Sequence, residues 1–116
     1  MGVYVFRCMQ YFKIGHYAKT NPWSRVAHRL FSSCKCPREI EEKISMDTLE
    51  LVAWFPTLNK RHEKKTHKLL KKFRVCGEWF TNEGMRSALC MLHLLGPMQR
   101  VLTQHKEQAM KTRRRL

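Results

Sequence analysis

The chain has few acidic residues: nine Asp and Glu stand against 23 Lys and Arg among 116 residues, a formal net charge of +14. Such a surplus destabilises the compact state through self-repulsion, and a small domain needs no more than roughly 8 charges for solubility. A polyanionic partner offsets the repulsion. The composition therefore favours nucleic acid, an anionic membrane surface or an acidic protein as the partner.

Long apolar runs are also missing. The uncharged stretch 87–99 is too short to cross a bilayer and contains Pro97. Residues 1–7 lack the basic, apolar and small-residue blocks of a secretory signal peptide. We therefore expect an intracellular protein, nuclear or cytoplasmic, with no membrane contact.

No cysteine spacing typical of a zinc site is present. The cysteines number five, and an odd count without a secretory signal argues against a disulfide framework. One residue separates Cys34 from Cys36, where zinc sites usually have two to four, and Cys76 is distant. We expect buried thiols and no stoichiometric zinc. A zinc-stabilised basic interaction protein stays open as an alternative.

The apolar residues, 43% of the chain, suffice for one modest core and one domain. Residues 3–8 and 11–15 predict two strands joined by a tight turn at Met9 and Gln10, and 49–55 predict a third. Between them, Asn21 as N-cap begins a helix that runs to about Phe31. Later helices are predicted over 60–73 with Asn59 as cap, from Asn82 to Leu95, and from Pro97 onward, with a turn and a short extended piece at 75–80.

The predicted order is β-β-α-β-α-α-α, an α+β fold with a three-stranded, mainly antiparallel sheet flanked by helices. We divide the chain into a domain over residues 1–96 and a basic C-terminal helix and tail over residues 97–116.

Four motifs follow one another along this framework. They are Val3-Tyr4-Val5, then Lys13-Ile14-Gly15 ten residues further on, then Arg25 on the next helix, and Glu78 in Gly77-Glu78-Trp79-Phe80. Each is weak alone, but together they resemble the GIY-YIG nuclease superfamily. They are closest to its DNA-binding branch from phages and large DNA viruses, in which Lys replaces the Tyr of the second motif. The resemblance covers residues 3–80 and implies a DNA-binding domain that acts as a metal-dependent endonuclease on phosphodiester bonds.

The resemblance assigns the general base to Tyr4. A free phenol has a pKa of about 10, and lowering it by about 2–3 units requires roughly 3–4 kcal/mol of phenolate stabilisation. Lys13, on the paired strand, is the cation that a hairpin can place beside Tyr4. His16 resembles a hydrogen-bonding partner of the base or the water, a role that the adjacent Tyr17 could also fill.

The resemblance further assigns Arg25 to the charge on the scissile phosphate, which its planar guanidinium suits. Glu78 resembles the single carboxylate that holds Mg²⁺ or another divalent cation, together with waters and phosphate oxygens. Each residue also has an ordinary structural explanation, such as a packed strand tyrosine or a solvated basic helix face. Glu63 and His67, four apart, we interpret as an intrahelical contact that braces the basic helix.

Two segments carry most of the positive charge. Residues 60–74 net +7 (eight cations less Glu63) and residues 85–116 net +6 (seven cations less Glu107). Beside a phosphate-handling motif, they predict a track for DNA, with RNA left open. The predicted nucleic-acid-binding residues are Arg29, Lys60, Lys64, Lys65, Lys68, Lys71, Lys72, Arg113, Arg114 and Arg115.

A catalytically silent nucleic-acid-binding module is the first alternative to the endonuclease. Val in place of Gly-Ile in the first motif and Lys in place of Tyr in the second favour it. We expect no separate recognition domain, so that site specificity would come from partners, from a homodimer or from the C-terminal tail.

Overall fold

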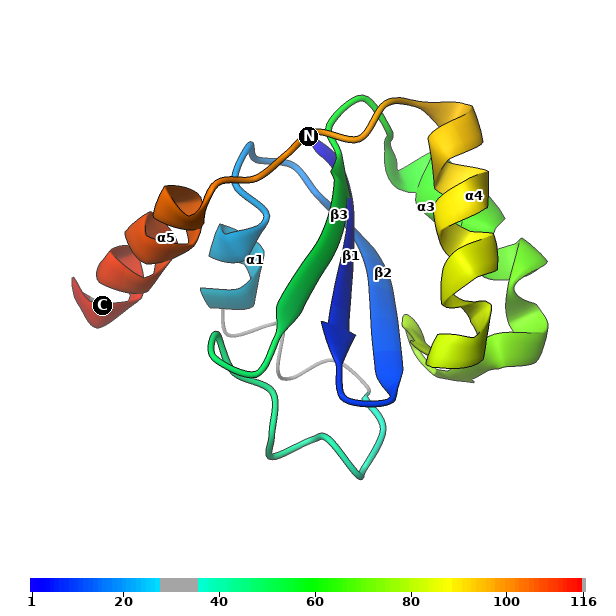
Figure 1. Ribbon diagram of the computed structural model, residues 1–116, viewed down its shortest axis with the longest axis horizontal. Helices are drawn as coiled ribbons and strands as arrows, with labels where there is room; N and C mark the ends of the chain where they lie inside the picture. Colours follow the sequence, from blue (N-terminus) through cyan, green and yellow to red (C-terminus); the bar gives the residue numbers. More distant parts are fainter. Residues whose placement is uncertain (28–35, 116) are drawn as a thin grey trace.

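The computed structural model describes residues 1–27 and 36–115 (Figure 1). Its centre is one five-stranded sheet with the strand order β3-β1-β2-β5-β4 and antiparallel pairing throughout. The strands are β1 (Gly2–Cys8), β2 (Tyr11–Tyr17), β3 (Glu50–Phe55), β4 (Arg74–Cys76) and β5 (Trp79–Thr81). The α+β class is therefore confirmed.

The prediction of three strands was wrong, because the segment expected as a turn and a short extended piece forms the hairpin β4-β5. Phe80 pairs with Phe12 and Trp79 with Lys13, so that β5 extends the sheet beyond β2. Gly77 takes a positive φ of 54° in the turn between the two strands, a conformation that glycine adopts without strain. Strands of three residues are too short for an alternating pattern to reveal them.

Helices cover both faces of the sheet (Figure 1). Helices α1 (Trp23–Ala27) and α5 (Thr103–Arg115) lie on one face, and α3 (Lys60–Leu69) and α4 (Met85–Leu95) lie on the other. Because side chains alternate along a strand, Tyr4 belongs to the core beneath α1 while its neighbours Val3 and Val5 belong to the core beneath α3 and α4. The two faces of β1 thus serve two separate cores.

Three predicted helix starts have different outcomes. Asn59 caps α3 as expected, since its side chain accepts from the amides of Arg61 and His62, while the His62 ring accepts from the Asn59 amide. Asn82 was wrongly predicted as a cap: it begins a 3-10 turn, its side chain donates to the Met9 carbonyl, and α4 starts three residues later. At the first helix, the Asn21 side chain accepts from the amide of Trp23.

The boundaries also differ in detail. Helix α3 ends at Leu69 and a 3-10 turn, Lys71–Phe73, completes the predicted 60–73 segment. The predicted extension of α1 to Phe31 lies outside the described residues. Within the described chain no helix has both the length and the apolar character needed to cross a membrane.

The C-terminal segment 97–116 contributes to the fold. The backbone N–H of Gln99 donates to the backbone carbonyl of Trp54, on the outer edge of β3, at 2.8 Å. Helix α5 begins only at Thr103. Ala109 of α5 is buried in the core that contains Trp23, and the Lys106 ammonium lies 4.6 Å from the centre of the Trp23 ring. Helix α5 is therefore packed on α1.

Candidate functional site

A cleft of about 390 Å³ opens beside the end of β2. It brings together residues from β1, β2, α1 and the β4-β5 turn. Tyr4, His16, Arg25 and Glu78, all predicted as catalytic, line it. The remaining residues around the cleft are Tyr17, Ala18 and Lys19.

The sheet register explains why Tyr4 and Glu78 lie at the same cleft. Tyr4 pairs with Gly15 across the β1-β2 hairpin. On the other side of β2, β5 pairs only with residues 11–13, so that beyond Lys13 no strand pairs with β2 on this side. The carbonyl of Glu78 accepts the amide of Ile14 at 3.1 Å, where β5 has not yet begun. Tyr4 and Glu78 therefore approach the same level of β2 from its two sides.

Gly15 is required at this level because the Tyr4 ring lies over it. A Cβ at position 15 would stand 2.2 Å from the Tyr4 hydroxyl oxygen and 2.3 Å from Cζ, far inside contact distance. Tyr4 is 1% exposed, and its ring packs against Phe6 at 5.3 Å between centroids. The Tyr4 ring therefore packs directly on the backbone of Gly15, the glycine of the second motif.

Lys13 lies beneath the cleft, with its side chain 1% exposed and its ammonium 3.7 Å from the Glu78 carboxylate. It is two residues from Gly15 on the same face of β2, which makes it a diagonal cross-strand neighbour of Tyr4. Such neighbours are roughly 7–8 Å apart at the backbone, within reach of long side chains. A buried ammonium needs anionic or polar partners, and Glu78 supplies one of them.

His16 stands on the wall of the cleft and bonds to α3. Its Nδ1 lies 2.5 Å from Oε2 of Glu63, a residue that is 5% exposed. Burial raises the pKa of the Glu63 carboxyl, and the charge of Glu78 adds to this, while His16 and His67 oppose it. The predicted intrahelical contact to His67 exists at 3.8 Å, but the closer partner of Glu63 is on the sheet. Sequence spacing showed only the weaker of the two contacts.

Arg25 is half-buried in α1 and faces the cleft, whereas Arg29 lies outside the described residues. With Lys19, Arg25 makes the mouth of the cleft cationic. Glu78 is the only carboxylate among the cleft residues, and its side chain is 37% exposed. The site therefore combines one accessible carboxylate with several cations.

This donor set fits a hydrated divalent cation and not a protein-caged one. Within residues 1–27 and 36–115, no three His, Cys, Asp or Glu side chains gather as metal ligands. Mg²⁺ is commonly held by one or two carboxylates and completes its shell with water and phosphate oxygens. Glu78 would be the protein ligand of such an ion.

The thiols are distributed over the fold. Cys8 is buried, Cys36 and Cys76 are half-buried and Cys90 is exposed, while Cys34 lies outside the described residues. The expected buried environment therefore applies fully to Cys8 and in part to Cys36 and Cys76. The absence of stoichiometric zinc stays a prediction.

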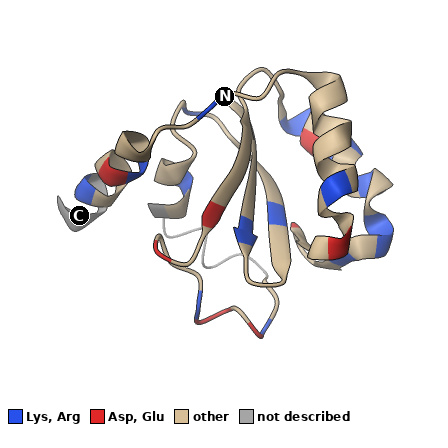
Figure 2. Ribbon diagram, viewed as in Figure 1, with Lys and Arg blue, Asp and Glu red and all other residues tan. Residues whose placement is uncertain are grey.

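Figure 2 shows that Lys and Arg residues follow one another along α3 and the turn after it, and we call the exposed cations of this segment the basic helix surface. Its only acid, Glu63, is turned into the interior, so all the charge presented to solvent is positive. A second cleft, of about 580 Å³, lies between the start of this surface and the first cleft, since Lys60 and Arg61 line it and His16 and Ala18 line both clefts. The exposed cations of the basic helix surface are Lys60, Arg61, Lys64, Lys65, Lys68, Lys71, Lys72 and Arg74.

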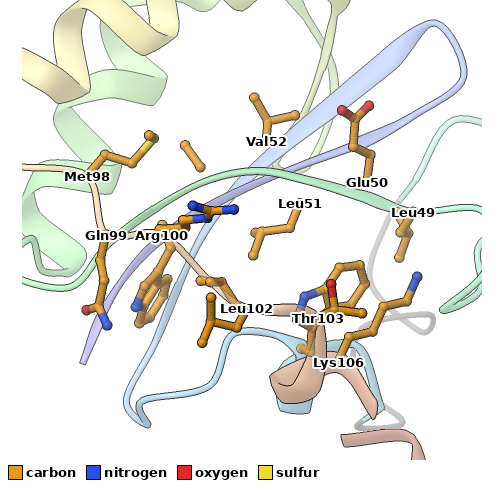
Figure 3. A pocket seen from close by; sticks show the side chains of 14 residues that line it. Leu49, Glu50, Leu51, Val52, Met98, Gln99, Arg100, Leu102, Thr103 and Lys106 are labelled. Atoms are coloured by element: carbon orange, nitrogen blue, oxygen red, sulfur yellow. The ribbon is translucent and has the colours of Figure 1, made fainter.

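A further groove, of about 570 Å³, follows the outer edge of β3 (Figure 3). Leu51 and Val52 form one side of it, and Met98 and Leu102 lie on the segment between α4 and α5. It is mostly apolar and includes none of the residues predicted as catalytic. Its size alone does not make it the functional site, because catalysis needs groups that transfer protons or stabilise charge.

Comparison with known proteins found no matching family model, no matching curated protein and no matching solved structure. The functional interpretation therefore depends on the geometry of the cleft and on the basic helix surface.

Proposed function

We propose that this chain is a GIY-YIG-like domain that binds DNA and hydrolyses a phosphodiester bond with a divalent cation. One observation carries the proposal: Tyr4, His16, Arg25 and Glu78 line a single cleft, and Lys13 contacts Glu78 from below. These residues are scattered along the chain, and their assembly around one space is not required for a stable core.

The charge distribution supports DNA as the partner. The cleft adjoins a second cleft, with His16 and Ala18 in the lining of both, and the second cleft is lined by Lys60 and Arg61 at the start of α3. A strand whose scissile phosphate sits in the first cleft can thus place neighbouring phosphates along the basic helix surface. Each phosphate neutralised by Lys or Arg releases condensed counterions, which favours binding.

In the proposed reaction, Tyr4 as phenolate takes a proton from a water molecule. The water oxygen bonds to phosphorus, and the bond from phosphorus to the leaving oxygen breaks. Lys13 favours the phenolate by its charge, and Arg25 stabilises the negative charge that grows on the phosphate oxygens. The leaving oxygen takes a proton from solvent. A cation held by Glu78 would polarise the phosphate and stabilise the leaving oxygen.

One observation favours the catalytically silent binding module as second candidate. The Lys13 ammonium stands 3.7 Å from the Glu78 carboxylate, so the ligand proposed for the cation already has a cationic neighbour. In that case the cleft binds a phosphate without cleaving it, and Arg25 and Lys19 provide the contacts.

Purified protein incubated with supercoiled plasmid, with and without Mg²⁺, distinguishes the two. The endonuclease predicts nicking that depends on Mg²⁺ and that falls by about 10²-fold or more in Tyr4→Phe, the typical contribution of a positioned acid or base. Glu78→Gln should abolish nicking, because the amide cannot hold the cation. Both variants should bind duplex DNA nearly as tightly as the wild type.

Two matched variants serve as controls. Tyr11→Phe removes a tyrosine hydroxyl that bonds to Glu39 outside the cleft, and Glu83→Gln changes an exposed glutamate that is also outside it. Both should nick like the wild type. Undiminished nicking by Tyr4→Phe would refute the mechanism, and DNA binding without nicking by the wild type on any DNA or RNA would establish the binding module.

A further inference from the structure

Glu63 is the one buried carboxylate among the described residues. It lies on α3 among exposed cations, yet its side chain turns towards the sheet. Removing a carboxylate from water costs free energy unless partners compensate the charge. The contacts of Glu63 therefore indicate its role.

Two histidines supply these contacts. Oε2 of Glu63 lies 2.5 Å from Nδ1 of His16, and Oε1 lies 3.8 Å from Nε2 of His67. Nε2 of His67 is also 2.8 Å from the carbonyl oxygen of Ile14. Because a carbonyl only accepts, this nitrogen of His67 carries a hydrogen. His67 thereby connects α3 to β2, while its 3.8 Å approach to Glu63 is longer than a hydrogen bond. The hydrogen bond of Glu63 is therefore the one to His16.

The state of His16 follows from its partner. Above its pKa the Glu63 carboxylate is ionised and only accepts hydrogen bonds, so Nδ1 of His16 donates to it there, whereas below that pKa the carboxyl can itself donate to Nδ1. In a neutral imidazole the other nitrogen, Nε2, is then the acceptor. The His16 side chain is 37% exposed and lines the cleft that also contains Tyr4. The accepting nitrogen therefore belongs to a ring at the candidate site.

We propose that Glu63 is a positioning residue that holds His16 as its Nδ1–H tautomer, so that Nε2 is the hydrogen-bond acceptor that the ring offers to the cleft. His16 pairs with Val3 and bonds to α3, whereas Tyr4 pairs with Gly15 and belongs to the core beneath α1, so the two side chains leave the sheet on opposite faces. The donor to Nε2 is therefore the attacking water, which His16 orients while Tyr4 takes its proton. The part of the proposal that concerns the water rests on the proposed function, whereas the tautomer of His16 does not.

The tautomer is measured directly by long-range ¹H–¹⁵N correlation spectra of the histidine rings, with the His16 signals assigned from a His16→Gln variant. We expect a protonated Nδ1 and an unprotonated Nε2 for His16 in the wild type at neutral pH. A ring that is protonated at Nε2 only would overturn the proposal, whatever the protein does to DNA.

Two substitutions separate the hydrogen bond from general packing. Glu63→Met keeps the volume and the helix propensity but removes the acceptor, so His16 should lose the Nδ1–H tautomer. Glu63→Gln keeps an acceptor oxygen and should retain it. Glu83→Met, on an exposed turn, is the control and should leave the His16 signals unchanged. Retention of the Nδ1–H tautomer in folded Glu63→Met would contradict the positioning role.

Nicking provides the second readout. Glu63→Met should lower it by about 10-fold to 100-fold, as removal of residues that orient a reactive ligand does, and Glu63→Gln should lower it less. The double variant Glu63→Met with His16→Ala should be no slower than His16→Ala alone, because Glu63 acts through His16. Additive effects of the two substitutions would overturn the proposal. If the wild type does not nick but the tautomers behave as expected, the proposed function fails and the positioning by Glu63 stands.

Discussion

Gly15→Ala tests the contact on which the site is built, because the Cβ it adds meets the Tyr4 ring. The new carbon would lie 2.2 Å from the hydroxyl oxygen and 2.3 Å from Cζ of Tyr4. Since non-bonded carbon atoms prefer about 3.5–4.0 Å, the ring or the strand must move by more than about 1 Å. Tyr4 is 1% exposed and packs against Phe6, so a shift of its ring disturbs the core around it.

The magnitude follows from the cost of overpacking a well-packed site, typically about 1–3 kcal/mol. Near the midpoint this corresponds to a fall in Tm of roughly 4–12 °C for a domain of this size. Without Tyr4 the sign should reverse, because Gly inside a strand is destabilising by roughly 0.5–1 kcal/mol relative to Ala. In a Tyr4→Leu background, Gly15→Ala should therefore be neutral or slightly stabilising.

Urea unfolding of the four proteins in this cycle measures the coupling, which we expect to be about 1–4 kcal/mol. Tyr17→Leu, a substitution at the neighbouring cleft tyrosine, is the matched background and should leave the cost of Gly15→Ala unchanged. A Gly15→Ala protein as stable as the wild type would refute the placement of the Tyr4 ring over Gly15.

Three further predictions concern charge, thiol reactivity and pH. Lys64→Gln with Lys68→Gln should lower the slope of log affinity against log salt by up to about 2, close to 0.9 for each phosphate that is no longer neutralised, as measured by fluorescence anisotropy; an unchanged slope would place this face off the DNA. Iodoacetamide should modify the exposed Cys90 in the native protein but Cys8 only after unfolding, since Cys8 is buried and burial raises the pKa of its thiol; mass spectrometry of the peptides decides this. Because burial raises the pKa of Glu63 above 4.5, the native state holds this proton more tightly than the unfolded chain. The stabilisation that Glu63 contributes to the free energy of unfolding should be fully present below pH 4.5 and decrease as pH rises from 4.5 to the native pKa. Glu63→Gln should remove that decrease. Identical pH profiles of the wild type and Glu63→Gln would contradict the raised pKa.

The local features of the fold were predictable because they depend on neighbouring residues. Runs of β-branched and aromatic residues predicted β1, β2 and β3, and the tight turn at Met9 and Gln10 joins the first two as expected. The cap of α3 was also correct, since Asn59 bonds to amides two and three residues away. The hairpin β4-β5 was missed because its strands are stabilised by pairing with β2 and not by a pattern of their own.

The candidate site was likewise predictable in its individual residues but not in their arrangement. Sequence motifs named Tyr4, His16, Arg25 and Glu78 individually, but each also had an ordinary structural explanation. Only the sheet register and the position of α1 placed them around one cleft. That placement depends on contacts between residues far apart in the chain, which no local pattern encodes.

By itself, the sequence determined the α+β class, the excess of positive charge and the order of the motifs, because composition and local periodicity are properties of neighbouring residues. Tertiary structure alone decided that the Tyr4 ring lies over Gly15, that Lys13 contacts Glu78, and that Glu63 turns away from the cations of its helix. The physical reason is desolvation: a buried charge must find a partner, and the fold determines which residue, however distant in sequence, is near enough to compensate it.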